Sequence, residues 1–275
     1  MIDMLTVGID VGSISTKVVL LAENKISHLI RPTGWSPRQV GQESYQEILE
    51  REGYSQNQVG YIVGTGYGRI SLPFAHKVVT EITCHGRGAS FLQPRTQLVI
   101  DVGGQDSKVI RIDRQGKVQN FIMNDKCAAG TGRFLQVMAA TLGLEVSELG
   151  ELGKLGELRN LEGKEEESPL VINSMCTVFA ESEVIGLLAQ GVDKASIVAA
   201  LHCSIAKRVA AMAKRVGVDG PVTFTGGVAR NEGIRKNLEQ ELSVPVIVPP
   251  ECQLAGALGA ALIGQEILLR ERMPD

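Results

Sequence analysis

Short, almost uninterrupted apolar segments recur along the first part of the chain, a pattern typical of strands that are buried on both faces. Strands are therefore predicted at 4–10, 18–22, 60–66, 97–101 and 109–112. Longer segments in which apolar residues recur at helical spacing predict helices. These helices cover 39–52, 75–92, the residues that follow Gly132, 178–190, 194–216, 232–242 and 254–270, and further strands are predicted at 221–225 and 244–248.

The first two predicted strands are joined by a small-residue turn that follows an acid. The segment Asp10-x-Gly12-Ser13-x-Ser15-x-Lys17 lies between two apolar segments, which favours a β-hairpin. A P-loop or a dinucleotide-binding glycine motif would have to lead into a helix, so neither is indicated. The segment Asp101-x-Gly103-Gly104-x-Asp106-Ser107-Lys108 repeats the same design about 90 residues later. An internal duplication is more specific than either copy alone.

A third glycine turn, Gly226-Gly227, follows the predicted strand at 221–225. Adjacent glycines allow a backbone to approach a ligand closely. The segment 147–168 departs from the pattern, because Leu-Gly pairs recur at every third residue and an acidic run follows. Such dense glycine disfavours a long helix, so we expect a surface excursion of short turns and loop there.

Composition and charge narrow the class of protein. The 275 residues are 44% hydrophobic and 21% charged, as in an ordinary soluble protein of one large or two modest domains. A formal net charge of −3 gives no reason to expect nucleic acid or an anionic membrane as a partner. The first residues lack the features of a signal peptide, and no apolar run approaches the roughly 20 residues that span a bilayer. We therefore expect a cytoplasmic protein.

The five cysteines do not form a recognisable motif by themselves. In a reducing compartment a disulfide framework is not expected, and the absence of a C-x-x-C pair argues against a zinc ribbon or a self-contained ferredoxin-type cluster. Cys127 and Cys176 each precede a predicted helix, where N–H groups and the helix dipole can stabilise a thiolate or hold an anion. A buried structural thiol is the alternative for both, and it is what we expect of Cys84, Cys203 and Cys252.

Four segments carry a resemblance to a known family: 8–13 (GIDVGS), 101–106 (DVGGQD), 124–132 (NDKCAAGTG) and 224–229 (FTGGVA). With them the chain resembles the actin, sugar-kinase and heat-shock-chaperone ATPase superfamily, and within it the BadF/BadG/BcrA/BcrD-type ATPases. These include the activators (archerases) of 2-hydroxyacyl-CoA dehydratases. The resemblance implies an α/β fold with two ribonuclease-H-like (actin-like ATPase) subdomains around a nucleotide cleft. Subdomain I would be 1–97, with the C-terminal helix 254–275 packing back on it, and subdomain II would be 98–253.

The resemblance also implies roles for individual residues. Asp10 and Asp101 would hold Mg²⁺ through waters, and Gln105, or alternatively Asp106, would orient the attacking water. The remaining contacts to ATP or ADP would come from both hairpins for the phosphates and from the third glycine turn and its surroundings for the adenosine. In order these residues are Gly12, Ser13, Ile14, Ser15, Thr16, Lys17, Gly103, Gly104, Gly226, Gly227, Asn231 and Lys236.

In the family that the chain resembles, a 4Fe–4S cluster is shared by two subunits, each of which gives two cysteines. Cys127 and Cys176 match those positions, which implies a homodimer with one cluster. ATP binding and hydrolysis would then move the helix after Cys127 and shift the reduction potential. The acceptor would be an iron–sulfur enzyme such as a 2-hydroxyacyl-CoA dehydratase, a benzoyl-CoA-reductase-type enzyme or a double-cubane-cluster protein. The electron source would be a ferredoxin or flavodoxin.

Two other functions stay open at this point. A small-molecule (sugar-type) kinase of the same superfamily would need the ATP site but not the cysteines. A nucleotide-gated binding module of the cell-shape or chaperone type would polymerise or bind peptides. Both would lack iron, so the iron content of the purified protein distinguishes them from an electron donor.

Overall fold

The predicted strands assemble into two five-stranded sheets. The computed structural model describes residues 5–23, 25–162, 170–172 and 176–272. Its chain divides into two compact units, one made of Met1–Val99, Ile110–Phe121 and Pro249–Asp275, the other of Ile100–Val109 and Ile122–Val248. The subdomain boundaries expected after residues 97 and 253 stay a prediction.

The first sheet contains the first predicted hairpin at its centre. Its order is β3-β2-β1-β4-β5, with β1, β2 and β3 antiparallel and with β4 and β5 added in parallel. The predicted hairpin is confirmed, since Asp10 and Lys17 are directly opposite each other. The strands are β1 (Leu5–Val11), β2 (Ser15–Ala22), β3 (Lys25–Pro32), β4 (Val59–Thr65) and β5 (Lys77–Val78).

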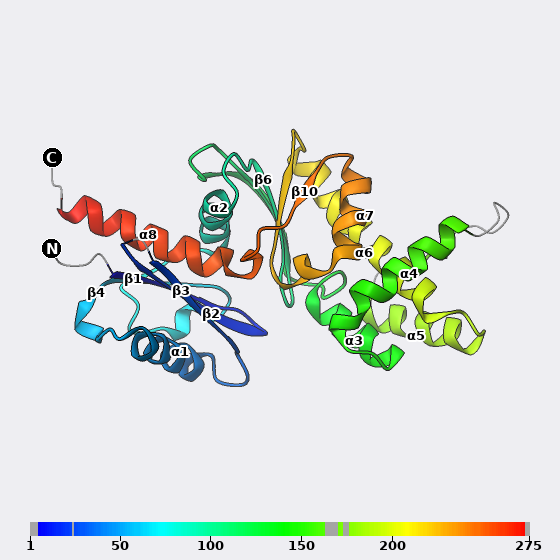
Figure 1. Ribbon diagram of the computed structural model, residues 1–275, viewed down its shortest axis with the longest axis horizontal. Coiled ribbons are helices and arrows are strands. Elements are labelled where there is room, and N and C mark those ends of the chain that lie inside the picture. Colours follow the sequence, from blue (N-terminus) through cyan, green and yellow to red (C-terminus); the bar gives the residue numbers. More distant parts are fainter. Residues whose placement is uncertain (1–4, 24, 163–169, 173–175, 273–275) are drawn as a thin grey trace. The chain divides into compact units, whose positions relative to one another are not determined.

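Helices cover both faces of the first sheet (Figure 1). On one face α1 (Pro37–Glu52) packs against β1, β2 and β3, and on the other α8 (Ala255–Arg272) packs against β1, β2 and β4. Helix α2 (Glu81–Leu92) lies against α8. Strand β2 shows the reason for its unbroken apolar sequence: Val18 and Leu20 join the core under α1, whereas Val19 and Leu21 join the core under α8.

The helix predicted at 75–92 begins later than expected. Thr80 is its N-cap, and its hydroxyl accepts a hydrogen bond from the Thr83 amide. The preceding Lys77 and Val78 are instead paired with β4 as the edge strand β5. The start of this helix is therefore set by strand pairing, which helical spacing of apolar residues does not reveal.

The second sheet repeats the topology of the first. Its order is β10-β9-β6-β7-β8, which read from the other end places its strands in the same succession as in the first sheet. Strands β9 and β10 are parallel, as are β4 and β5. The internal repeat seen in the sequence therefore extends from one hairpin to a whole sheet. The strands are β6 (Leu98–Val102), β7 (Ser107–Ile112), β8 (Val118–Asn124), β9 (Val222–Thr225) and β10 (Val246–Ile247).

The described residues of the second unit form five helices after the sheet strands β6–β8, and α6 is central among them. Helix α6 packs against both α4 and α7, while α3 packs against α5 (Figure 1). The helices are α3 (Gly132–Leu142), α4 (Leu149–Glu162), α5 (Thr177–Ala189), α6 (Lys194–Val216) and α7 (Glu232–Leu242). Short 3₁₀ turns complete the chain at Gln56–Gln58, Arg69–Ser71, Val146–Glu148, Gly227–Arg230 and Cys252–Leu254.

Helix α4 corrects the expectation of a surface loop at 147–168. Each glycine in a helix costs about 1 kcal/mol relative to alanine, which is why the Leu-Gly repeat disfavoured a helix. A Cβ on Gly156 would lie 2.1 Å from the carbonyl oxygen of Ala195, so this glycine lets the backbones of α4 and α6 come into contact. Leu149 is fully buried at the start of α4. Tertiary packing thus outweighs the low helix propensity. Of the acidic run from Glu162 to Glu167, residues 163–167 lie outside the described residues.

Two helical segments of the described residues, α6 and Cys252–Glu271, which includes all but the last residue of α8, are long and apolar enough to cross a membrane by length and composition. We had expected no segment of that kind. In each, 67% of the most apolar window is buried inside the fold, and core helices of soluble proteins have the same property. The helix predicted at 194–216 is confirmed, but the expectation that no apolar segment would be long enough to span a bilayer was wrong. Many small residues interrupt the larger apolar side chains in both helices.

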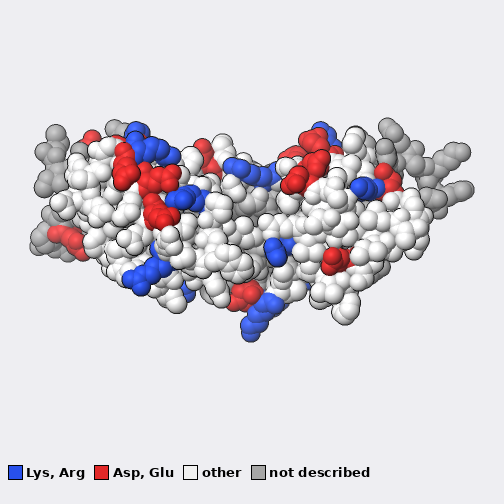
Figure 2. Space-filling model, turned by 90° about the horizontal axis from the view of Figure 1, so that it is seen from below, with Lys and Arg blue, Asp and Glu red and all other residues white. Residues whose placement is uncertain are grey.

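Charged side chains of both signs lie close together on the face shown in Figure 2. Ion pairs between β3 and α1 are of this kind, with Arg31 contacting Glu43 at 3.6 Å and Glu47 at 3.2 Å. Exposed pairs of this type contribute about 1 kcal/mol or less to stability. They help to orient α1 but contribute little to the stability of the fold.

Candidate functional site

The first hairpin holds Asp10 at the end of β1 under a tightly bonded turn. Asp10 is only 4% exposed, and its carboxylate lies 3.4 Å from the ammonium nitrogen of Lys17. The Gly12 amide donates to the Ser15 carbonyl at 3.1 Å, which closes the turn. Thr33, just beyond β3, donates from its hydroxyl to the Gly12 carbonyl at 2.7 Å. The turn is thus fixed before any ligand binds.

The second hairpin has the same geometry. The Gly103 amide donates to the Asp106 carbonyl at 3.0 Å, as Gly12 does to Ser15. Asp101 is 1% exposed, and its carboxylate lies 3.5 Å from the ammonium of Lys108. Lys108 also pairs with Asp106 at 2.7 Å. The repeat in the sequence therefore corresponds to a repeat in the structure, with an acid and a lysine at matching places in each unit.

Lys108 is a residue whose role the sequence did not predict. It is 2% exposed, and a buried ammonium requires anionic partners because its desolvation is costly. Two carboxylates supply them, so Asp106 serves as a partner of Lys108. Gln105, by contrast, is exposed at the tip of the turn.

The third glycine turn packs against the end of β6, next to Asp101. Thr225 donates from its hydroxyl to the Asp101 carboxylate at 2.8 Å. Gly226 has a φ of +90°, and a Cβ there would lie 2.3 Å from the Val102 carbonyl oxygen, so only glycine fits. Asn231 ends the turn as the N-cap of α7, and its side-chain oxygen accepts the Ile234 amide at 3.1 Å. Lys236 follows on α7 and is half-buried.

A fourth glycine belongs to this set and was missed. Gly66 follows β4 as Gly226 follows β9, it has a φ of +87°, and a Cβ there would lie 2.3 Å from the Asp10 carboxylate. The signal was present in the sequence, since Thr65-Gly66 and Thr225-Gly226 follow equivalent strands. Each of these two acids therefore has a threonine-glycine pair at the end of the neighbouring strand in its sheet.

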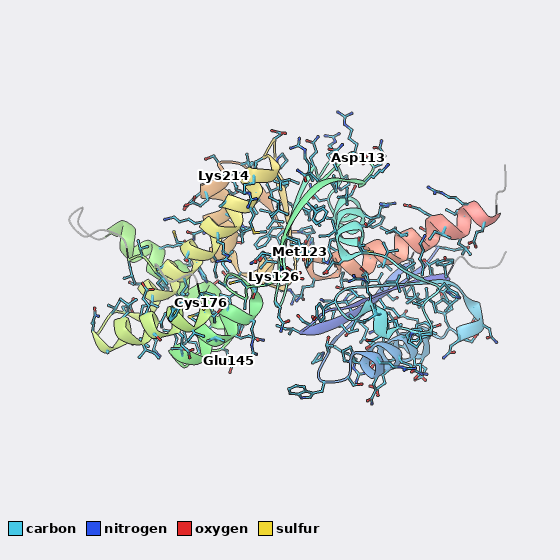
Figure 3. All side chains as sticks on the ribbon, turned by 180° about the vertical axis from the view of Figure 1, so that it is seen from behind. Asp113, Met123, Lys126, Glu145, Cys176 and Lys214 are labelled. Atoms are coloured by element: carbon cyan, nitrogen blue, oxygen red, sulfur yellow. The ribbon has the colours of Figure 1, made fainter. Side chains whose placement is uncertain are left out.

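Cys127 and Cys176 lie in the second unit, and both are free thiols. Cys127 is half-buried in the loop between β8 and α3, where its carbonyl accepts a hydrogen bond from the Asn124 side chain at 3.1 Å. Cys176 is exposed and is the N-cap residue of α5. It is labelled in Figure 3. The prediction that Cys176 lies at the start of a helix is confirmed.

The other cysteines differ in burial. Cys84 and Cys252 are buried, and burial raises the pKa of the Cys84 thiol to about 12. A thiol with so high a pKa is unreactive at neutral pH, as expected of a structural residue. Cys203, which we expected in the core, is only half-buried on α6.

The start of α3 is bonded to the second hairpin. The Gly132 amide donates to the Gly103 carbonyl at 2.9 Å, and the Arg133 amide donates to the Gly104 carbonyl at 2.8 Å. We had expected the first amides of this helix to be available to an anion near Cys127. They are instead used to hold the Gly103-Gly104 turn, and Cys127 lies five residues before the helix begins.

Comparison with known proteins shows which protein family has this set of glycine turns. A sequence profile described as the BadF/BadG/BcrA/BcrD ATPase family matches residues 7–264. The chain belongs to this ATPase family. The match includes both hairpins, the third glycine turn and both cysteines, so family membership covers the whole candidate site.

Relatives within the BadF/BadG/BcrA/BcrD family are similar along nearly their whole length. The (R)-2-hydroxyglutaryl-CoA dehydratase activating ATPase of Acidaminococcus fermentans is 45% identical over 260 residues, which are 94% of this chain and 95% of that protein. A benzoyl-CoA reductase subunit of Thauera aromatica is 35% identical over 274 residues, covering 94% of this chain and 93% of that subunit. A solved structure of the 2-hydroxyisocaproyl-CoA dehydratase activator of Clostridium difficile with bound ADPNP has 40% identity and a TM-score of 0.85, covering 98% of this chain and 97% of that one.

More distant structures agree on the fold. A ROK-family glucokinase from Streptomyces griseus has a TM-score of 0.57 at 14% identity, covering 95% of this chain and 99% of the glucokinase. Identity this low shows the fold alone. The chain therefore has the actin-like ATPase fold, α/β with two related mixed sheets, as expected.

Proposed function

We propose that this ATPase is an electron donor that uses ATP to activate a partner iron–sulfur enzyme. The observation that carries the proposal is 45% identity over 94% of the chain to an ATPase that activates a dehydratase. Similarity to a benzoyl-CoA reductase subunit keeps more than one partner class open. The acceptor would be a 2-hydroxyacyl-CoA dehydratase, a benzoyl-CoA-reductase-type enzyme or a double-cubane-cluster protein. A ferredoxin or flavodoxin would supply the electrons, and the protein would be cytoplasmic.

The two hairpins would bind the phosphates of ATP through the turns Gly12–Thr16 and Gly103-Gly104. Asp10 and Asp101 would hold Mg²⁺, and their carboxylate oxygens are the hard ligands that this ion prefers. Each already pairs with a lysine ammonium 3.4 to 3.5 Å away, so Mg²⁺ would share the carboxylate with that cation. Gln105 is better suited than Asp106 to orient the attacking water, because Gln105 is exposed and Asp106 is paired with Lys108.

The third turn would contact the adenosine through the backbone at Gly226 and Gly227. The Asn231 side chain is less available than the sequence suggested, since its oxygen caps α7 and its nitrogen contacts His202. Its contribution would therefore be to hold the turn. Lys236 stays a predicted neighbour of the nucleotide.

Cys127 and Cys176 from two copies of the chain would together hold one 4Fe–4S cluster. The thiols present fit such a group: both are free, and Cys176 is exposed. No set of three or more metal-ligand side chains occurs within the part of the chain that the structure describes. Two cysteines from each of two copies complete a four-cysteine site. When bound, such a cluster takes up and releases one electron.

Helix α5 offers a surface for the second copy beside Cys176. Val178, Phe179 and Ile185 are 64%, 66% and 53% exposed. Exposed large apolar side chains that lie together on one helix, here next to the proposed cluster ligand Cys176, are typical of a protein interface. This exposure supports the homodimer that the shared cluster requires.

The bonds between the second hairpin and α3 would connect the nucleotide to Cys127. Gly132 and Arg133 donate to the carbonyls of the turn that we propose to bind phosphate. A change of that turn when the γ-phosphate leaves would be passed to the start of α3. A ligand shifts such an equilibrium only by its different affinity for the two states, so the effect depends on contacts made by the turn.

Iron content tests this proposal most directly. The protein purified without oxygen is expected to hold about four iron atoms per dimer, the content of one cluster. Cys127→Ser and Cys176→Ser are expected to lose the iron, whereas Cys203→Ser, which changes a half-buried thiol on α6, is expected to keep it. Iron-free wild-type protein, or a cluster that survives either of the first two substitutions, would contradict the shared site.

A further inference from the structure

A histidine outside the predicted site lies in the middle of the second unit. His202 on α6 is fully buried, with no exposed surface. A Cβ on Gly153 of α4 would lie 2.4 Å from its Nδ1, and a Cβ on Gly233 of α7 would lie 2.3 Å from the same atom. The imidazole therefore fills a space that two glycines leave open, and three helices meet around it.

The ring makes one hydrogen bond, and that bond goes to the third glycine turn. His202 Nε2 lies 3.0 Å from the side-chain nitrogen of Asn231. The Asn231 oxygen is used by the Ile234 amide, so its nitrogen is the atom that faces the ring. An amide nitrogen only donates, and Nε2 must therefore accept, with the ring proton on Nδ1. Burial lowers the pKa of His202 to about 4, which keeps the ring neutral and able to accept.

Packing alone does not account for an imidazole at this place. Nδ1 is buried and has no hydrogen-bond partner among the described residues. Leaving a donor unpaired costs stability, and a leucine would fill a similar volume without that loss. The bond to Asn231 is what an apolar side chain could not provide.

The hydrogen bond from Asn231 to His202 holds the turn Gly226–Asn231 at its last residue. The Asn231 backbone amide donates to the Val228 carbonyl at 2.9 Å, and its side chain caps α7. At its other end the turn is held by Gly226 against Val102. The turn Gly226–Asn231 is thus fixed at one end by strand β6 and at the other by His202.

We propose that His202 is a positioning residue of the nucleotide site, which holds the Gly226–Asn231 turn in the shape that receives the adenosine. The inference rests on the proposed function, in which that turn contacts the nucleotide. It assigns His202 no contact with ATP. His202 acts through Asn231, and its removal weakens nucleotide binding more than it slows hydrolysis by the bound complex.

Steady-state ATPase kinetics with two substitutions at His202 test the role of the ring. His202→Leu removes the acceptor, and we expect KM for ATP and the Kd of ADP to rise about tenfold, equivalent to about 1.4 kcal/mol, with little change in kcat. His202→Gln places an amide oxygen near the position of Nε2 and is expected to restore most of the affinity. Unchanged nucleotide affinity in His202→Leu would overturn the proposal.

Two further variants separate positioning from general loss of stability. Asn231→Ser keeps an N-cap for α7 but cannot reach His202, so it is expected to raise KM as His202→Leu does, and the double variant no further. Asn231→Ser also tests the proposal if His202→Leu does not fold, since an unchanged KM in Asn231→Ser overturns the proposal.

Val209→Ala removes buried volume from α6, the helix that contains His202, and is expected to lower Tm without changing KM. An equal rise of KM in Val209→Ala would show a stability effect only. Wild-type protein that binds no ATP would instead refute the proposed function.

Discussion

The pairing of one acid with one lysine occurs twice in this protein, but the two copies differ in burial. The side chains of Lys17 and Asp10 are 16% and 5% exposed, whereas those of Lys108 and Asp101 are 3% and 2% exposed. A deeper ammonium needs more compensation, and Asp106 provides it in the second copy. The sequence placed both lysines in the repeat. Only the structure shows that Lys108 depends on two carboxylates.

His202 makes stability depend on pH in a direction that follows from its burial. Its pKa falls from 6.5 in the unfolded chain to about 4 in the fold. Below pH 6.5 the unfolded chain takes up a proton that the folded chain does not, so acid favours unfolding at this residue. Between pH 7 and pH 5 the contribution to the unfolding free energy should fall by about 2 kcal/mol.

Urea unfolding of wild type and His202→Gln at several pH values measures this contribution. The difference in unfolding free energy between wild type and His202→Gln should change by about 2 kcal/mol between pH 7 and pH 5, because glutamine does not titrate. Parallel curves would show that the His202 ring is accessible to protons in the folded protein.

At the scale of elements, α4 shows how tertiary contact overrides propensity. Its glycines are not equivalent, because Gly156 packs against Ala195 whereas a Cβ on Gly150 would meet nothing within 4 Å. We therefore predict opposite effects of the same substitution. Gly156→Ala should destabilise by about 1–3 kcal/mol through overpacking, while Gly150→Ala should stabilise by up to about 1 kcal/mol through helix propensity.

Thermal unfolding of the two alanine variants measures both effects in one helix. A change of 1 kcal/mol corresponds to a shift in Tm of about 2–4 °C for a chain of this size. A gain in Tm for Gly156→Ala would mean that α4 and α6 are not in close contact. A loss for Gly150→Ala would mean that this end of the helix is not formed in solution.

At the scale of the whole molecule, the two sheets have the same strand order, and the central strand of each has an acid one residue before its end, Asp10 in β1 and Asp101 in β6. The duplicated architecture explains why each unit has one Gly-rich hairpin and one threonine-glycine pair. The cysteines have no such counterpart, because both lie in the second unit. The redox part of the proposed function is therefore an addition to one of the repeats, and it needs a second copy of the chain to be complete.

Association of two chains is the testable consequence. Phe179 is 66% exposed on α5 beside Cys176, so Phe179→Glu should weaken the dimer at least about tenfold by placing a charge in an apolar interface. Ile70 is 87% exposed in the first unit, and Ile70→Glu should leave association unchanged. Sedimentation of both variants without oxygen compares them. If Phe179→Glu and Ile70→Glu dimerise equally well, the dimer interface does not include this face of α5.

Much of the fold and part of the site could be predicted from the sequence, because the evidence for them is local. Unbroken apolar segments follow from strands covered on both faces, as in β2, and a glycine-rich turn between two such apolar segments predicts a hairpin. The repeat and the motif around Cys127 were sufficient to place the chain in its family.

The tertiary structure decided what depends on residues far apart in the chain. It made 149–162 a helix because Gly156 meets Ala195, gave Lys108 two partners, and bonded the start of α3 to the Gly103-Gly104 turn. It also placed His202 against Asn231. These contacts have no local signature, since each joins a side chain or a backbone group to one that only folding brings near. Local sequence determined the elements and the motifs, and packing determined how they act on one another.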